Sequence, residues 1–128
     1  MASATEMVTD FVKQWEQPGG FERAVEQYFT DETVWENVGM LTTTGKQEAM
    51  AFFSSFGEST GMSGMRVDNL AVAEIGNKVL TERIDHVLDK DGNAIMSIRV
   101  MGIFELDGSK ITAWRDYFDT AGLAGGGQ

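Results

Sequence analysis

The sequence predicts an α+β fold, in which N-terminal helices cover one face of a curved, mixed but mostly antiparallel sheet. In the first half of the chain, apolar residues recur at three- and four-residue intervals, as on amphipathic helices. The second half alternates apolar and polar residues between short turn motifs, as in strands. The length of 128 residues suggests one domain, 1–128, and the 42% hydrophobic content is enough to bury a core. A curved sheet covered by helices encloses a conical cavity, which is a common place for a small-molecule site.

Three helices and one short strand are predicted in the first half. The first helix begins after a cap at Ser3 or Thr5 and ends at the breaker Pro18–Gly20. Its apolar face combines i, i+3 and i, i+4 steps and is formed by Met7, Val8, Phe11, Val12 and Trp15. The following elements are a helix over Phe21–Phe29, a strand over Asp31–Val38, a loop over Gly39–Gly45 and a helix over Lys46–Phe56.

Four strands are predicted in the second half, over Met65–Ile75, Lys78–Leu88, Ala94–Leu106 and Lys110–Asp119. Glycine, asparagine and aspartate fill the short segments between them, which is typical of tight antiparallel connections. We therefore expect an antiparallel meander. The glycine-rich segment Gly122–Gln128 is expected to be a frayed tail.

The amino-acid composition excludes several classes of binding partner. The formal net charge of −10 would repel a nucleic-acid backbone or an anionic membrane surface, so we expect neither as a partner. The chain has no cysteine, which excludes disulfides, thiolate metal ligands and a thiol nucleophile. Its apolar runs are shorter than the roughly 20 residues that span a membrane, and Met1–Asp10 lacks a secretory pattern, so we expect a cytoplasmic protein. A neutral, apolar small molecule suits this chain best.

A group of charged side chains lies on otherwise mostly apolar faces of the predicted strands. Strand alternation places Arg83 and Asp85 on the same face, roughly 7 Å apart along the strand. On the last strand, Trp114 and Phe118 share a face with Asp116, which predicts a partly buried carboxylate. The face of the intervening strand that we expect toward the cavity is wholly apolar and comprises Met96, Ile98, Val100, Gly102 and Phe104. Arg83, Asp85 and Asp116 would then lie at the polar end of the cavity.

This arrangement suits acid–base chemistry. Two carboxyl groups that share one guanidinium resist joint ionisation, so one keeps a proton while the other loses it. Such a pair can protonate an epoxide oxygen and activate a water molecule without a metal or a covalent intermediate. A purely structural cross-strand ion pair is the alternative interpretation. The single histidine, His86, lies on the opposite strand face from Asp85, and no two-histidine metal motif or phosphate-binding glycine loop is present.

Four segments resemble motifs of the limonene-1,2-epoxide hydrolase family. Leu80–Asp85 resembles its "TER-x-D" strand, and Lys110–Asp119 resembles its "KIT-x-WRDYFD" strand. Val100–Leu106 is similar to the family's glycine-containing apolar strand, and Trp35–Gly39 to its "Tyr-x-Asn" strand. The resemblance extends from about Glu6 to Asp119. It implies the cone-shaped fold of the nuclear transport factor 2-like group, which includes ketosteroid isomerase-like and SnoaL-like proteins.

The resemblance also implies a role for each matching residue. Asp85 would be the general acid, Asp116 the base that activates water, Arg83 the bridge between them, and Asn37 the residue that holds the water. The wall of the pocket would include Val87, Ile98, Val100 and Phe118.

One position departs from the family pattern. Trp35 stands where the family usually has tyrosine, and an indole can donate but not accept a hydrogen bond. The water would therefore be held by Asn37 and Asp116 alone, or by Asn37 and the Trp35 N–H.

We therefore expect a cofactor-independent epoxide hydrolase that converts an apolar epoxide to a vicinal diol. Terpene, steroid and polyketide-derived epoxides are all compatible with the sequence. The resemblance implies a homodimer, formed through the outer sheet face that carries Ser97, Arg99, Met101, Arg115 and Tyr117. Two alternatives remain open: a proton-shuttling enzyme of the ketosteroid isomerase or polyketide cyclase kind, and a non-catalytic module that binds an apolar ligand.

Overall fold

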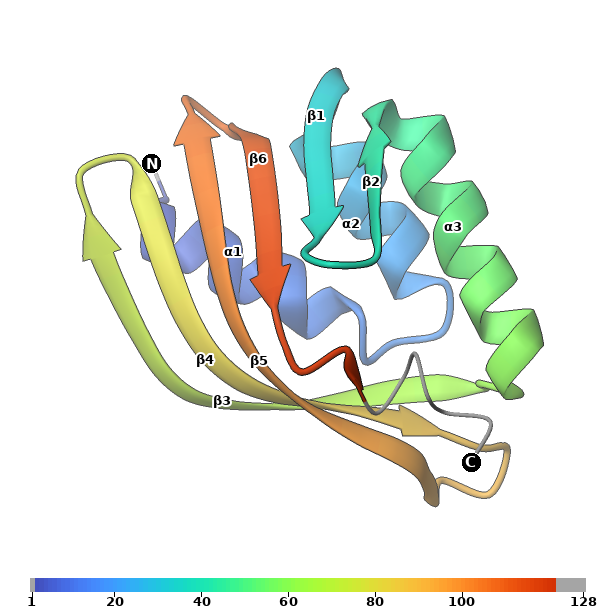
Figure 1. The fold of residues 1–128 in the computed structure, drawn as a ribbon. Helices are drawn as coiled ribbons and strands as arrows, with labels where there is room; N and C mark the ends of the chain where they lie inside the picture. Colours follow the sequence, from blue (N-terminus) through green and yellow to red (C-terminus); the bar gives the residue numbers. More distant parts are fainter. Residues whose placement is uncertain (1, 122–128) are drawn as a thin grey trace.

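The computed structural model describes residues 2–121, in which three helices pack on one side of a strongly curved six-stranded sheet (Figure 1). The predicted α+β class is therefore confirmed. The tail predicted over Gly122–Gln128 lies outside the described residues. None of the helices within residues 2–121 is long and apolar enough to cross a membrane.

The helices begin and end close to the predicted positions. They are α1 (Ala4–Gln14), α2 (Gly20–Tyr28) and α3 (Gly45–Thr60). Ser3, rather than Thr5, caps α1, and its side chain forms a reciprocal capping box with Glu6. The helix predicted to end at Phe56 continues for one more turn, to Gly61, where a left-handed backbone conformation (φ 78°) favours glycine and ends it.

The sheet has the strand order β2-β1-β6-β5-β4-β3. The strands are β1 (Phe29–Asn37), β2 (Leu41–Thr44), β3 (Gly64–Ile75), β4 (Lys78–Leu88), β5 (Ala94–Asp107) and β6 (Lys110–Tyr117). From β3 to β6 consecutive strands pair antiparallel, as predicted, whereas β1 joins β6 in parallel. This parallel pairing brings the first strand of the chain beside the last one, and so joins both halves of the sequence in one sheet.

The prediction of a loop over Gly39–Gly45 was wrong for most of that segment, because it contains β2. Residues Leu41–Thr44 pair antiparallel with the end of β1, and Leu41 lies directly opposite Asn37. Four residues are too few to show a clear alternation, so the pattern alone did not reveal the strand. The last predicted strand is shorter than expected: β6 ends at Tyr117, and Phe118 follows it.

The core lies between the concave face of the sheet and the helices, and aromatic rings form much of it. Phe11 of α1 is fully buried at its centre. Within about 6 Å of its ring centroid lie the rings of Trp15, Tyr28, Phe29, Phe104 and Trp114. This packing of α1 against β5 and β6 closes one end of the cone and leaves the other end for a cavity.

Candidate active site

A cavity of about 90 Å³ opens between the sheet and the helices. Its wall is apolar except for three side chains, those of Asn37, Asp85 and Asp116. The residues predicted for the wall all line it, namely Val87, Ile98, Val100 and Phe118. Two methionines that the sequence suggested for the core or the pocket, Met40 and Met65, also line it. The sequence did not assign the phenylalanines of α2 and α3 to the cavity, namely Phe21, Phe52, Phe53 and Phe56.

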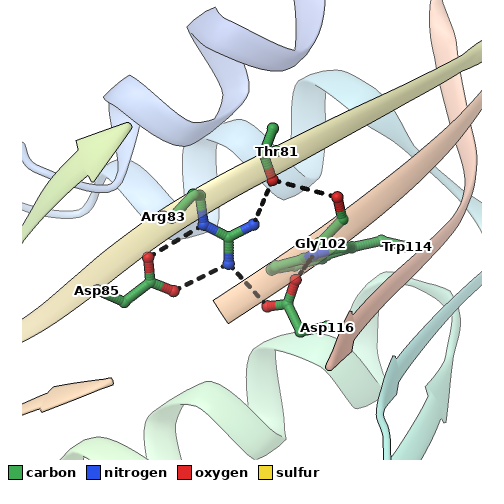
Figure 2. Close-up of polar contacts among 6 residues, drawn as sticks. All are labelled: Thr81, Arg83, Asp85, Gly102, Trp114 and Asp116. Carbon is green, nitrogen blue, oxygen red and sulfur yellow. Dashed lines mark hydrogen bonds and ion pairs between the residues drawn. The ribbon is translucent and has the colours of Figure 1, made fainter. Parts of the chain in front are cut away.

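Arg83 connects the two carboxylates (Figure 2). Its Nε donates to Oδ1 of Asp85 over 3.0 Å, and its Nη2 donates to Oδ2 of Asp85 over 2.9 Å. The same Nη2 donates to Oδ2 of Asp116, also over 2.9 Å. Nη1 donates to the hydroxyl of Thr81, which in turn donates to the carbonyl of Gly102. The guanidinium is therefore hydrogen-bonded to three side chains, and it interacts with both carboxylates at the same time.

The strand register explains how an arginine on β4 reaches an aspartate on β6. Thr81, Gly102 and Asp116 are direct neighbours across β4, β5 and β6, and Asn37 of β1 continues the same row. Arg83 crosses β5 at Gly102. A Cβ atom at that position would collide with the Arg83 guanidinium and with Oδ1 of Asp116. Because Gly102 has no side chain, the Arg83 guanidinium can pass over β5 and bond to both carboxylates.

Asp116 lies in an unusually dry environment, being only 5% exposed. Burial raises the pKa of its carboxyl group above the usual value, the charge and hydrogen bond of Arg83 oppose this increase, and the nearby charge of Asp85 adds to it. The Trp114 Nε1 also donates to Oδ1 of Asp116 over 2.7 Å, which favours the ionised form. Asp116 therefore holds a proton more tightly than an ordinary aspartate, and becomes a stronger base once it is ionised.

Arg83 remains charged in this environment. Burial by itself would lower its pKa, but the carboxylates of Asp116 and Asp85 outweigh that effect and raise it. The guanidinium carbon also lies 5.4 Å from the ring centroid of Trp15, within the range of a cation–π contact. The site thus contains one permanent buried cation beside two acids. One cation can balance the charge of only one carboxylate, and burial disfavours the charge of the other.

Three polar groups of the cavity-lining residues have no bonding partner. Among the described residues, the buried Nε1 atoms of Trp15 and Trp35 and Nδ2 of Asn37 form no hydrogen bond. All three residues line the cavity, and Asn37 lies directly opposite Asp116 on the neighbouring strand. Buried donors of this kind normally have a partner, so a small polar molecule is well suited to this place. A water molecule there would lie within reach of the Asp116 carboxylate.

Residues outside the cavity carry none of this chemistry. His86 lies on the opposite sheet face, as predicted, where its two ring nitrogens contact Ser97 and Asp68 over 2.7 and 2.9 Å. Within residues 2–121, no three histidine, aspartate or glutamate side chains are grouped closely enough to ligate a metal ion.

Three contributors to the site were missed or undervalued at the level of sequence. Thr81 shares the face of Arg83 on β4, and this alternation is the signal that could have identified it. Gly102 was assigned only to an apolar face, because nothing in a single sequence shows what must pass over a glycine. Trp114 was noted as a neighbour that buries Asp116, but its hydrogen bond depends on a side-chain direction that the pattern does not contain.

Comparison with known proteins identifies a family. The sequence profile described as limonene-1,2-epoxide hydrolase catalytic domain matches residues 2–125. The epoxide hydrolase EphG of Mycobacterium tuberculosis is 35% identical over 89 residues, which are 70% of this chain and 56% of that protein. The chain therefore aligns with little more than half the length of this curated relative.

Solved structures agree with the fold. The structure of a limonene epoxide hydrolase-like epoxide hydrolase from M. tuberculosis superposes with a TM-score of 0.75 at 28% identity, over 96% of this chain and 83% of that one. A putative SnoaL-like polyketide cyclase from Shewanella putrefaciens gives a TM-score of 0.78 at 12% identity, over 98% of this chain and 85% of that one. The second match shows the fold alone, and it confirms the predicted SnoaL-like α+β fold.

Replacing Gly102 with alanine tests the gap beneath Arg83. We expect Gly102→Ala to lower the free energy of unfolding by about 1–3 kcal/mol, because the methyl group displaces a buried guanidinium from its partners. The matched control is Gly64→Ala in β3, where an added Cβ meets no atom within 4 Å and a change of about 0.5 kcal/mol or less is expected. Urea denaturation measures both variants, and equal stability of the two would contradict the crossing that we describe.

Proposed function

Because the chain belongs to the limonene-1,2-epoxide hydrolase family, we propose that it is an epoxide hydrolase that needs no cofactor. It would add water directly to the epoxide of an apolar small molecule and release a vicinal diol. The observation that carries this proposal is the buried Arg83, which bonds to both Asp85 and Asp116 at the polar end of an otherwise apolar cavity. An apolar cavity favours an uncharged substrate, and the carboxyl pair supplies the acid and the base that ring opening requires.

In the proposed reaction, Asp85 is the general acid. As the carbon–oxygen bond of the ring breaks, the proton of Asp85 moves to the departing oxygen, which becomes one hydroxyl group of the diol. Arg83 donates to both oxygens of Asp85 and stabilises the carboxylate that remains. Ring strain supplies driving force, so an acid of moderate strength is sufficient.

Asp116 is the proposed base. It takes one proton from a water molecule while the water oxygen attacks the ring carbon, and this oxygen becomes the second hydroxyl group. Asn37 lies beside Asp116 across the β1–β6 pair, so its amide can orient the water toward the carboxylate. The unpartnered indole N–H of Trp35 can donate to the same water but cannot take a proton from it.

The proposed working state has a proton on Asp85 and a charge on Asp116, although burial by itself favours the protonated form of Asp116. Water held by Asn37 donates a hydrogen bond to Asp116, which favours the ionised form of that group, and an epoxide oxygen accepts from the protonated Asp85. After one turnover the proton resides on Asp116. It must return to Asp85 before the next turnover, and both groups stay bonded to Arg83 throughout.

Isotope incorporation tests the reaction class and the base together. In a single turnover in ¹⁸O-labelled water, direct attack predicts one labelled oxygen in the diol. We expect Asp85→Asn and Asp116→Asn each to lower kcat by about 100-fold or more, because each removes a proton-transfer group. Mass spectrometry of the diol and initial rates measure the two effects, with Glu82→Gln on the outer face of β4 as the control.

An unlabelled diol from a single turnover would indicate a covalent carboxylate intermediate and would refute direct water attack. Full activity of Asp116→Asn would refute the assignment of the base. If a broad panel of epoxides gave no turnover at all, the function itself would be wrong, and an isomerase, a cyclase or a binding module would be the better description.

The raised pKa of Asp116 predicts a pH effect. Asp116 must be ionised to act, so kcat/KM should fall on the acid side at a higher pH than the ordinary aspartate value of 3.8 would give. The Trp114 N–H favours the ionised form, so its loss in Trp114→Phe should raise this pKa further and move the acid limb to higher pH. The pH–rate profile measures the limb. Tyr28→Phe is the control, because Tyr28 is a buried aromatic residue that does not line the cavity. A shift of the limb to lower pH in Trp114→Phe would contradict the role of the Trp114 indole.

We further propose that the protein forms a homodimer through the outer face of the sheet. Met101 and Tyr117 lie directly opposite each other on β5 and β6, and each is 48% exposed, which is unusual for large apolar side chains. Analytical ultracentrifugation should find a dimer, and Met101→Glu should convert it to a monomer. Ile75→Glu, at an exposed position on β3, should leave the dimer intact, and a monomeric wild-type protein would contradict the proposal.

A further inference from the structure

Trp35 is a rigid part of the cavity wall beside the carboxyl pair. Its ring stacks on Trp114 with a centroid distance of 4.4 Å and an interplanar angle of 4°. Phe52 meets it edge-on at 5.3 Å, and Phe21 lies at 5.4 Å. The side chain is almost fully buried, and aromatic neighbours from three elements prevent it from turning aside.

The cavity that remains is small. Its volume of about 90 Å³ is less than the roughly 150 Å³ in which a protein interior can accommodate benzene, and far below the 300–1,000 Å³ of sites for drug-sized ligands. The exposed Met40 marks its open side, whereas Asp85 and Asp116 are buried. A substrate must therefore bring its epoxide inward and leave any larger group near the opening.

The wall of the cavity combines aromatic and aliphatic side chains. Trp35 and its aromatic neighbours line it together with aliphatic side chains from β4 and β5, namely Val87, Ile98 and Val100. Trp35 lines the same small cavity as Asn37 and Asp116, so an epoxide placed for attack by a water between these two residues shares that space with the indole. Bulky substituents on both carbons of the epoxide would then need the space that the indole occupies.

We propose that Trp35 sets an upper limit on substrate size, so that the site accepts compact epoxides with a single apolar substituent, such as a phenyl ring, and excludes epoxides with bulky groups on both carbons. This inference rests on the proposed epoxide hydrolase function. It concerns the substrate class and leaves the chemistry of the carboxyl pair unchanged.

Two epoxides that differ by one phenyl group test the limit. We expect the wild-type protein to prefer styrene oxide over trans-stilbene oxide by at least about tenfold in kcat/KM. Trp35→Tyr and Trp35→Phe both reduce the ring, and each should lower this ratio by about tenfold. If a Trp35 variant binds the attacking water less well, kcat/KM falls equally for both epoxides. The ratio of the two kcat/KM values therefore reports the effect of substrate size alone.

Tyr28→Phe provides the matched control, because it changes a buried aromatic residue of α2 that does not line the cavity. Its ratio should stay within about twofold of the wild-type value. Calorimetric binding of the two product diols, 1-phenylethane-1,2-diol and hydrobenzoin, measures the same limit without turnover, and the wild-type protein should prefer the smaller diol.

The inference is overturned if the wild-type protein handles both epoxides equally well, or if neither Trp35 variant changes the ratio. If the wild-type protein opens no epoxide, the proposed function fails, and the relative affinity for the two diols still decides the size limit. A preference for the smaller diol that Trp35→Tyr removes would support the limit even in that case.

Discussion

The guanidinium of Arg83 is the interaction on which the rest of the site depends. It lies fully buried between β4 and β6 and bonds to a carboxylate on each of these strands. This is possible because the strand between them carries Gly102 at the crossing point. The ring of Trp15, directly after α1, lies over the cation. The local geometry of one glycine thus decides whether two distant segments of the chain form one acid–base unit.

Such a unit stabilises the fold less than its number of bonds suggests. Removing charged groups from water costs several kcal/mol per ion, and their mutual attraction often only offsets that cost. The raised pKa of Asp116 is a sign of this tension, because its ionised form is disfavoured by burial. The aromatic core around Phe11 supplies stability independently of the polar group. The molecule therefore combines a well-packed core, where α1 meets β5 and β6, with a group of buried charges that stabilises the fold little but suits acid–base catalysis.

Strand alternation was enough to predict which charged residues share a strand face, but not the hydrogen bonds that connect them across strands. Arg83 and Asp85 share one face of β4 because strand side chains alternate, and this holds in any sheet. That Arg83 also reaches Asp116 depends on the register of three strands, which a single sequence does not contain. The parallel pairing that places Asn37 beside Asp116 joins residues far apart in the chain and was not predicted. Only the family resemblance indicated that these two residues act on the same water. The helical wall of the cavity was not predicted. The sequence identifies Phe52 and Phe53 as apolar residues of α3, but it does not show which part of the sheet they face.

Asp116 titrates within a buried unit, in which burial and the charge of Asp85 raise its pKa while Arg83 opposes that increase. Nuclear magnetic resonance of protein labelled with ¹³C at the aspartate side-chain carboxyl groups follows this directly as a function of pH. We predict a signal that disappears in Asp116→Asn, titrates above the ordinary aspartate value, and changes its midpoint when Asp85 is replaced by asparagine. A signal for Asp116 that titrates at 3.8 or below, regardless of Asp85, would contradict the account.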